Sequence, residues 1–143
     1  MKTFVYGARF EPGDERGVVV SFPDVPEAIT QGVNETDAMV QAQEALGLAL
    51  LTYPARGKPL PAASPVGTDL IPIAVDADDA AKIALLDAFR EAGISKSEFG
   101  RRIGKDEKEV RRLLDPAHPS KLSSVTEALR ALGRRLVIGV EAA

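Results

Sequence analysis

Apolar and polar side chains alternate over short runs in the first 32 residues, which is the pattern of half-buried β-strands. The alternation predicts strands at residues 2–10, 17–22 and 28–32, and the second of these is rich in β-branched valine. Pro and Gly within residues 11–15 supply the dihedral angles of a hairpin loop, and prolines within residues 23–26 end the second strand. We therefore expect an antiparallel meander at the N-terminus.

The apolar spacing changes to three and four residues after Asn34, which predicts an amphipathic helix that packs on this sheet. Asn34 and Asp37 form a variant of the capping box at the start of the helix, and Pro54 stops it. The predicted inner face of the helix consists of small and apolar residues: Ala38, Ala42, Ala45, Leu46, Ala49, Leu50 and Tyr53.

Residues 54–69 hold four of the ten prolines and two glycines, so we expect a long extended connection and not a packed element. Residues 70–75 are apolar and predict a fourth strand. Pro72 has no N–H to donate to a neighbouring strand, which places this strand at an edge of the sheet. The resulting order β-β-β-α-β predicts a small α/β sandwich in a first domain at residues 1–76.

From residue 77 onward the pattern is helical, which predicts an all-α second domain at residues 77–143 and an α+β protein as a whole. The first helix of this domain is capped by Asp76 or Asp79 and ends at Gly93, where a left-handed residue is expected. Its predicted core face consists of Ile83, Leu86 and Phe89.

Residues 94–114 predict two short helices joined by a tight turn, which is the arrangement of a helix-turn-helix unit. Two capping boxes open the helices, one formed by Ser95 with Glu98 and the other by Asp106 with Glu109.

Three further residues fit the same unit. Gly100 leaves room for the second helix to cross closely, Gly104 supplies the turn, and Val110 fills the space between the helices. Lys105 departs from the usual pattern, because an apolar residue is common there.

Charge is divided unevenly along the chain. Residues 1–80 carry five basic and twelve acidic groups, a net −7, whereas residues 81–143 carry thirteen basic and nine acidic groups, a net +4. Such a division suggests that the two halves have different partners. The basic half suits a polyanion, and the acidic half suits a basic protein.

The second helix of the helix-turn-helix unit is the candidate for reading DNA, because its exposed N-terminal part enters the major groove in this fold. Its outward side chains are Glu107, Lys108, Arg111 and Arg112. Side chains that could contact the flanking phosphates are Lys96, Arg101, Arg102, Lys121, Arg134 and Arg135. The alternative is a structural helical module with a salt-bridged surface. The acids at positions 106, 107 and 109 either take part in reading bases or only favour the N-terminus of the helix.

The C-terminal segment at residues 135–140 is predicted to be a strand that joins two DNA-binding domains. Its apolar side chains are Leu136, Val137, Ile138 and Val140. A lone strand beside a helical module leaves unpaired backbone groups, which a second chain can satisfy. The alternative is that this strand folds back onto its own helices.

Few features of the sequence suit catalysis or cofactor binding. There is no cysteine, and His118 is the single histidine, so we expect no metal, no cofactor and no enzyme activity. The carboxylates of Asp14, Glu15, Asp24 and Glu27 lie in predicted turns, where acids are common for local reasons. No apolar run approaches the length of a membrane span or a signal peptide, so the chain is expected to stay in the cytoplasm.

Three segments of the first domain form a distinctive series: YGARF at residues 6–10, GVVVSFPDVP at residues 17–26 and AITQG at residues 28–32, followed by the alanine-rich helix and the proline-rich segment. Together they resemble the HicB antitoxin family. The closing ALGRRLVI resembles the end of the Cro/repressor-like helix-turn-helix that many of these antitoxins carry. The resemblance covers essentially the whole chain.

The resemblance implies a partial ribonuclease-H-like first domain without nuclease activity. It also implies a partner, the HicA toxin, a small basic ribonuclease that cleaves messenger RNA. The protein would neutralise this toxin and repress its own operon by binding operator DNA as a dimer or higher oligomer. The alternative is a stand-alone helix-turn-helix regulator whose N-terminal domain senses a ligand or another protein.

Overall fold

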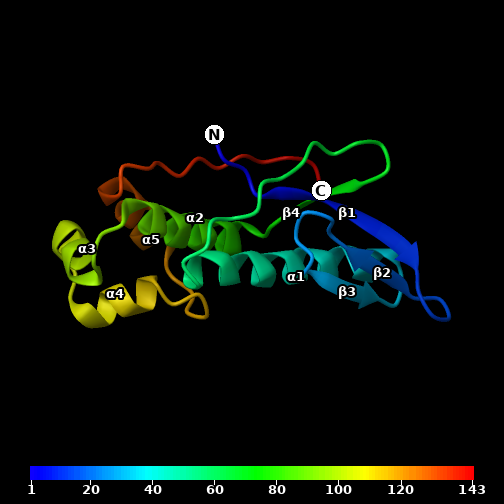
Figure 1. The fold of residues 1–143 in the computed structure, drawn as a ribbon, viewed down its shortest axis with the longest axis horizontal. Coiled ribbons are helices and arrows are strands. Elements are labelled where there is room, and N and C mark those ends of the chain that lie inside the picture. Colours follow the sequence, from blue (N-terminus) through cyan, green and yellow to red (C-terminus); the bar gives the residue numbers. More distant parts are fainter. The chain divides into compact units, whose positions relative to one another are not determined.

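The computed structural model describes residues 1–143, which form two compact units at Met1–Ala80 and Ala81–Ala143 (Figure 1). Unit 1 contains a sheet and a long helix, and unit 2 is helical. The expectation of a mixed α and β protein is confirmed at this level. The boundary between the units falls within a helix, after residue 80, whereas the predicted domain boundary was at residue 76.

The sheet of unit 1 has four antiparallel strands in the order β3-β2-β1-β4. The strands are β1 (Val5–Pro12), β2 (Val18–Ser21), β3 (Ile29–Gly32) and β4 (Ile71–Ala74). The predicted order β-β-β-α-β and the edge position of the last strand are confirmed, since β4 pairs with β1 alone. Pro72 of β4 lies opposite Gly7 of β1. The other side of β4 faces no further strand, which suits a residue that has no N–H to donate to one.

The helix α1 (Glu35–Ala55) packs against β2 and β3. The Asn34 side chain accepts a hydrogen bond of 2.8 Å from the Asp37 N–H, and the Asp37 carboxylate accepts one of 2.9 Å from the Val33 N–H. Gly32 allows the end of β3 to approach the helix, because a Cβ there would overlap the backbone of Ala38. The buried face of α1 includes most of the predicted stripe, with Ala38, Ala42, Leu46, Ala49 and Leu50.

The proline-rich connection after α1 is more firmly held than predicted. It contains no helix or strand until β4, but the Tyr6 hydroxyl donates a hydrogen bond of 2.6 Å to the Pro61 carbonyl. The carboxylate of Asp24 accepts two bonds from Ser64, at 2.7 Å from its N–H and 2.8 Å from its hydroxyl. The expectation of an extended connection without a packed element is confirmed, and the side chains of Tyr6 in β1 and Asp24 in a turn hold it at two points.

Unit 2 consists of α2 (Ala77–Ala92), α3 (Lys96–Ile103), α4 (Glu107–Leu113) and α5 (Leu122–Ala131). The rings of Phe89 and Phe99 lie with their centroids 5.3 Å apart. The core cluster consists of Ala81, Leu85, Ala88, Phe99, Val110, Leu113, Val125, Ala128 and Leu129.

The predicted core face of α2 is confirmed as buried or half-buried, but it was incomplete. Phe89 does pack against the cluster, but Leu85 is its central residue from α2, and Ala81 and Ala88 flank it. Ile83 and Leu86 are buried but lie outside this cluster.

The predicted C-terminal strand is absent. Gly133 ends α5 in the left-handed region, with φ at +75°, and the Arg134 N–H donates to the Leu129 carbonyl. Residues 134–143 then form neither helix nor strand. A strand needs a neighbour for its backbone groups, and this single chain offers none to the segment.

Candidate nucleic-acid interface

The turn between α3 and α4 is built by local hydrogen bonds. The Ser95 hydroxyl caps α3 by accepting from the Glu98 N–H, and Asp106 caps α4 by accepting from the Glu109 N–H. Gly104 adopts the left-handed conformation at φ +67°, which turns the chain within three residues. Only half of each predicted capping box forms, because Glu98 and Glu109 face arginines on their own helices.

Gly100 is the point of closest approach between the two helices. A Cβ at Gly100 would lie 3.0 Å from Cγ2 of Val110 and 3.1 Å from the carbonyl oxygen of Lys105. Both distances are tighter than ordinary van der Waals contact. The predicted roles of Gly100 and Val110 in helix crossing thus have a direct geometric basis.

The outer face of α4 is charged and exposed. Glu107, Lys108, Arg111 and Arg112 are all exposed, while Val110 and Leu113 of the same helix are buried. The Nη2 atom of Arg111 lies 2.9 Å from the Glu107 carboxylate, and the Nη1 atom of Arg112 lies 4.0 Å from the Glu109 carboxylate. Lys108 makes no such pair, so its ammonium group is available to a ligand.

The charged groups of α3 are also paired. The Glu98 carboxylate accepts from Nε of Arg101 at 2.9 Å, from NH2 of Arg101 at 2.5 Å and from Nε of Arg102 at 3.1 Å. These hydrogen bonds hold the pKa of Glu98 below its ordinary value and raise that of Arg101. Lys96, at the start of α3, is exposed and unpaired. The predicted DNA-binding residues of α3 and α4 therefore lie on one helix pair, but all four arginines there have an acidic partner.

Lys82 of α2 is a residue that the sequence analysis missed. Its ammonium group is buried and donates to the carbonyl oxygens of Arg112 and Leu113, at 3.2 and 2.8 Å, and to the Ser120 hydroxyl at 2.8 Å. Burial lowers the pKa of Lys82, and the charge of Asp115 opposes that effect. The only available signal was a lysine on the apolar side of a helix, and its acceptors are 30 or more residues away.

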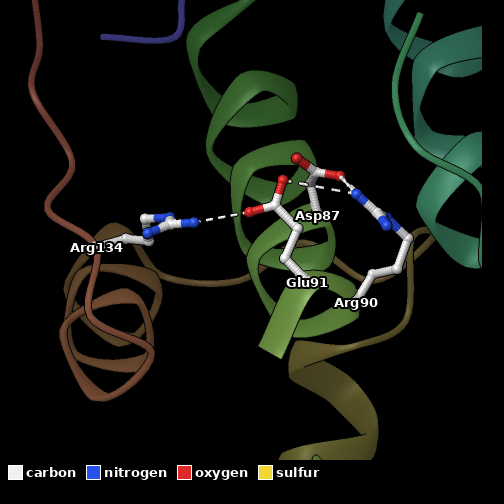
Figure 2. A network of polar contacts seen from close by, with 4 residues as sticks. All are labelled: Asp87, Arg90, Glu91 and Arg134. Carbon is white, nitrogen blue, oxygen red and sulfur yellow. Dashed lines mark hydrogen bonds and ion pairs between the residues drawn. The ribbon is translucent and has the colours of Figure 1, made fainter. Parts of the chain in front are cut away.

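The remaining candidate phosphate contacts differ in their surroundings. Lys121 precedes α5 and Arg135 follows the turn at Gly133, and both are exposed. NH2 of Arg134 lies 2.7 Å from the Glu91 carboxylate of α2 (Figure 2). In the same network Arg90 reaches the carboxylate of Asp87 at 3.0 Å and that of Glu91 at 3.6 Å. Arg134 thus fixes the start of the C-terminal segment to α2.

The four residues predicted to join two chains do not share one environment. Leu136 is half-buried against the core cluster of unit 2, as the fold-back alternative expects. Val137, Ile138 and Val140 are exposed, at 61%, 62% and 97%. An exposed apolar run of this kind is the part of the segment that a second chain could cover.

Two acidic side chains in the turns of unit 1, Asp24 and Glu27, bind residues that are distant in sequence. Asp24 binds Ser64, and the Glu27 carboxylate accepts a hydrogen bond of 2.5 Å from the Tyr53 hydroxyl. This bond lowers the pKa of Glu27 and raises the pKa of Tyr53 to about 12. No three His, Cys, Asp or Glu side chains gather in a way that could hold a metal ion. None of the helices has the length and hydropathy of a membrane span.

Comparisons with known proteins give a consistent result. A family described as HicB_like antitoxin of bacterial toxin-antitoxin system matches residues 5–84. Antitoxin HicB 1 of Photorhabdus laumondii is 33% identical over 141 residues, which cover 99% of this chain and 90% of that protein. Antitoxin HicB of Escherichia coli K12 is 38% identical over 131 residues, with 92% and 95% covered, and Antitoxin HicB of Pseudomonas fluorescens is 36% identical over 135 residues, with 93% and 90% covered. The chain therefore belongs to the HicB-like antitoxin family of bacterial toxin–antitoxin systems.

Proposed function

We propose that this antitoxin binds and neutralises a HicA-type mRNA-cleaving toxin through residues 1–76 and represses its own operon by binding operator DNA through residues 77–143. Membership of the antitoxin family supports the first part, because relatives named Antitoxin HicB align over nearly the whole chain. No step of this role requires catalysis, a metal or a cofactor.

One observation carries the operator-binding part. The helices α3 and α4 cross at Gly100 and Val110 around a left-handed Gly104, and this crossing leaves one face of α4 exposed. This is the arrangement expected of a helix-turn-helix, with α4 as its recognition helix. Lys108, Arg111 and Arg112 are the proposed contacts on that helix, Lys96 and Arg101 those on α3, and Glu107 faces the same side.

The charge of unit 1 supports the choice of partner. Residues 1–80 carry a net −7, which favours a basic protein, and the toxin implied by the family resemblance is small and basic. Charge complementarity speeds encounter more than it strengthens the final complex. We therefore propose that the net negative charge of the acidic half attracts the toxin. This role belongs to the half as a whole and to no single residue of it.

We further propose that the exposed part of the C-terminal segment joins two chains. Val137, Ile138 and Val140 would pair with the same segment of a second copy, and Leu136 would remain on its own core. Two-fold pairing brings together two recognition helices, as an inverted repeat with half-sites one helical turn apart requires.

Co-purification from the native operon tests the function. The operon is expressed with a tag on this chain, and the eluate is analysed for a co-purifying toxin and for binding to the operon's own promoter DNA. We expect a stable complex with a small basic protein, and preferential retention of promoter DNA over random DNA. Absence of any toxin from the eluate, together with no growth inhibition by the neighbouring reading frame, would contradict the antitoxin role.

The alternative is a stand-alone regulator whose N-terminal domain senses a ligand or another protein. The exposed charged face of α4 also supports this stand-alone regulator, because binding to promoter DNA through that face requires no toxin. A chain that binds promoter DNA but fails to relieve the toxicity of the neighbouring gene product would support this alternative.

A further inference from the structure

We propose that Lys82 is a positioning residue for operator recognition: its buried ammonium group fixes the C-terminal end of α4 and thereby the placement of the side chains that read DNA. This inference rests on the proposed operator binding. Lys82 is 5% exposed, so it does not contact DNA itself. Its effect must act through the groups it binds.

The contacts of Lys82 match the capacity of a charged lysine. An ammonium group has three N–H donors, and this one has three acceptors, the carbonyls of Arg112 and Leu113 and the hydroxyl of Ser120. Burying a charge is unfavourable unless it is hydrogen-bonded, so the observed geometry is the arrangement in which a buried lysine is tolerated. The interaction joins α2, α4 and the segment that leads into α5.

Helix α4 needs such an anchor. It has seven residues, too few for a helix that is stable by itself. Its last carbonyl groups have no partners within the helix, and a positive charge at that end complements the helix dipole. Asp106 caps the other end, and Val110 and Leu113 hold the inner face. Lys82 therefore completes the set of contacts that determines where α4 lies.

Arg112 connects this anchor to recognition. Its carbonyl oxygen binds Lys82, while its guanidinium group is on the exposed face. A shift of the last turn of α4 displaces Arg112 and the neighbouring Arg111 together. Base contacts are sensitive to such shifts, whereas phosphate contacts in random DNA tolerate them.

The test compares full-length Lys82→Met with Arg130→Met, which removes one exposed positive charge from α5. Affinities for operator and random DNA are measured over a salt series, at a temperature at which thermal unfolding shows both variants to be folded. We expect the operator-to-random affinity ratio of Lys82→Met to fall by about five- to hundredfold, the range for lost base contacts. Its affinity for random DNA and its salt slope should equal those of Arg130→Met.

A folded Lys82→Met with the ratio of the parent would overturn the role of Lys82. A salt slope reduced by about one unit relative to Arg130→Met would also overturn it, since that result indicates a direct phosphate contact. If Lys82→Met does not fold, Lys82→Gln replaces it: the amide is polar enough to occupy the site, but it is uncharged, one bond shorter and has two N–H donors, so it cannot make all three bonds. An unchanged ratio in that variant overturns the proposal. A parent protein without preference for the operator would remove the operator-binding function itself.

Discussion

At Gly100 the separation of two helices depends on one missing methyl group. We expect Gly100→Ala to destabilise unit 2 by about 1–3 kcal/mol, because its Cβ would be forced against Val110 and the Lys105 carbonyl. Chemical denaturation of the full chain, followed by a signal from unit 2, measures the change.

A double-mutant cycle provides the control for Gly100. Val110→Ala removes the nearer obstacle, so Gly100→Ala should cost less in that background than in the parent. Equal costs in the two backgrounds would show that the close approach at Gly100 does not limit packing.

The pair of Glu27 and Tyr53 makes unit 1 sensitive to pH at two limits. The pKa of Glu27 is lowered, so its stabilising effect is present above the ordinary value for a glutamate and is lost as pH falls through the lowered pKa. The pKa of Tyr53 is raised to about 12, so its contribution is complete below its ordinary value of 10.0 and is lost as pH rises toward about 12.

Tyr53→Phe tests this pair. Loss of the hydroxyl should raise the pKa of Glu27 toward its ordinary value, as followed by an NMR titration of its carboxyl carbon. Glu27→Gln is the matched variant. It should lower the pKa of Tyr53 relative to the parent, as followed by the absorbance of tyrosinate during a pH titration. A Glu27 pKa that is the same in the parent and in Tyr53→Phe would contradict the assignment.

Residues with local signals could be predicted, and residues with distant partners could not. Asn34, Ser95 and Asp106 cap helices as expected, because a cap bonds to an N–H three residues later. The acceptors of Lys82 are 30 to 38 residues away, and nothing near it in the sequence indicates them. Tyr6 reaches Pro61 across an even longer separation.

Among the helices, α4 gives the most direct functional prediction. Lys108→Ala and Arg111→Ala should each weaken operator binding while toxin neutralisation stays intact. A lost bidentate base contact costs about 1–3 kcal/mol, and a lost phosphate contact lowers the salt slope by about one unit. The ion pair of Arg111 with Glu107 is exposed and therefore offers little resistance to DNA. Operator titration over a salt series, with Arg130→Ala as the control, distinguishes a lost base contact from a lost phosphate contact. If both variants bind the operator as the parent does, α4 is not the recognition helix.

The C-terminal segment gives a second prediction at this scale. The double variant Val137→Ser, Ile138→Ser should convert the protein to a monomer that binds the operator weakly. Both side chains are exposed in the single chain and are the ones proposed to pack against a second copy. Leu136→Ser is the contrasting variant: it should destabilise unit 2, since Leu136 packs on its core. Light scattering and thermal unfolding separate the two effects, and a double variant that keeps the parent's oligomeric state would refute the pairing.

Helices and strands with a clear periodicity of apolar residues could be predicted, but the elements with which they pair or pack could not. The alternation in β1 and the helical spacing in α1 were correct to within a few residues at each end. The segment after Gly133 has the composition of a strand, and it forms none because composition does not supply a pairing partner.

For the whole molecule, the charge of the first half predicts how toxin binding depends on salt. A fragment of residues 1–75 should protect cells from the toxin, because all four strands and α1 lie within it. Its association rate with a basic toxin should fall with rising salt, while the dissociation rate changes little. Stopped-flow mixing at several salt concentrations measures both rates. Continued toxicity despite soluble expression of the fragment would show that the second half is also needed.

The uneven distribution of charge coincides with the division of the chain into units. The net −7 and the net +4 belong to residues 1–80 and 81–143, and the two compact units have these same bounds.

The paired arginines of α3 have a consequence for the proposed search for an operator in a genome. Binding to random DNA is driven mainly by release of the small cations condensed on phosphates. Arg101 and Arg102 share the Glu98 carboxylate as a built-in counterion, so together they would displace fewer of those cations. If the proposed operator binding holds, we expect the protein to dwell only briefly on random DNA. A larger share of the antitoxin would then stay free in solution, where the proposed toxin partner could be captured.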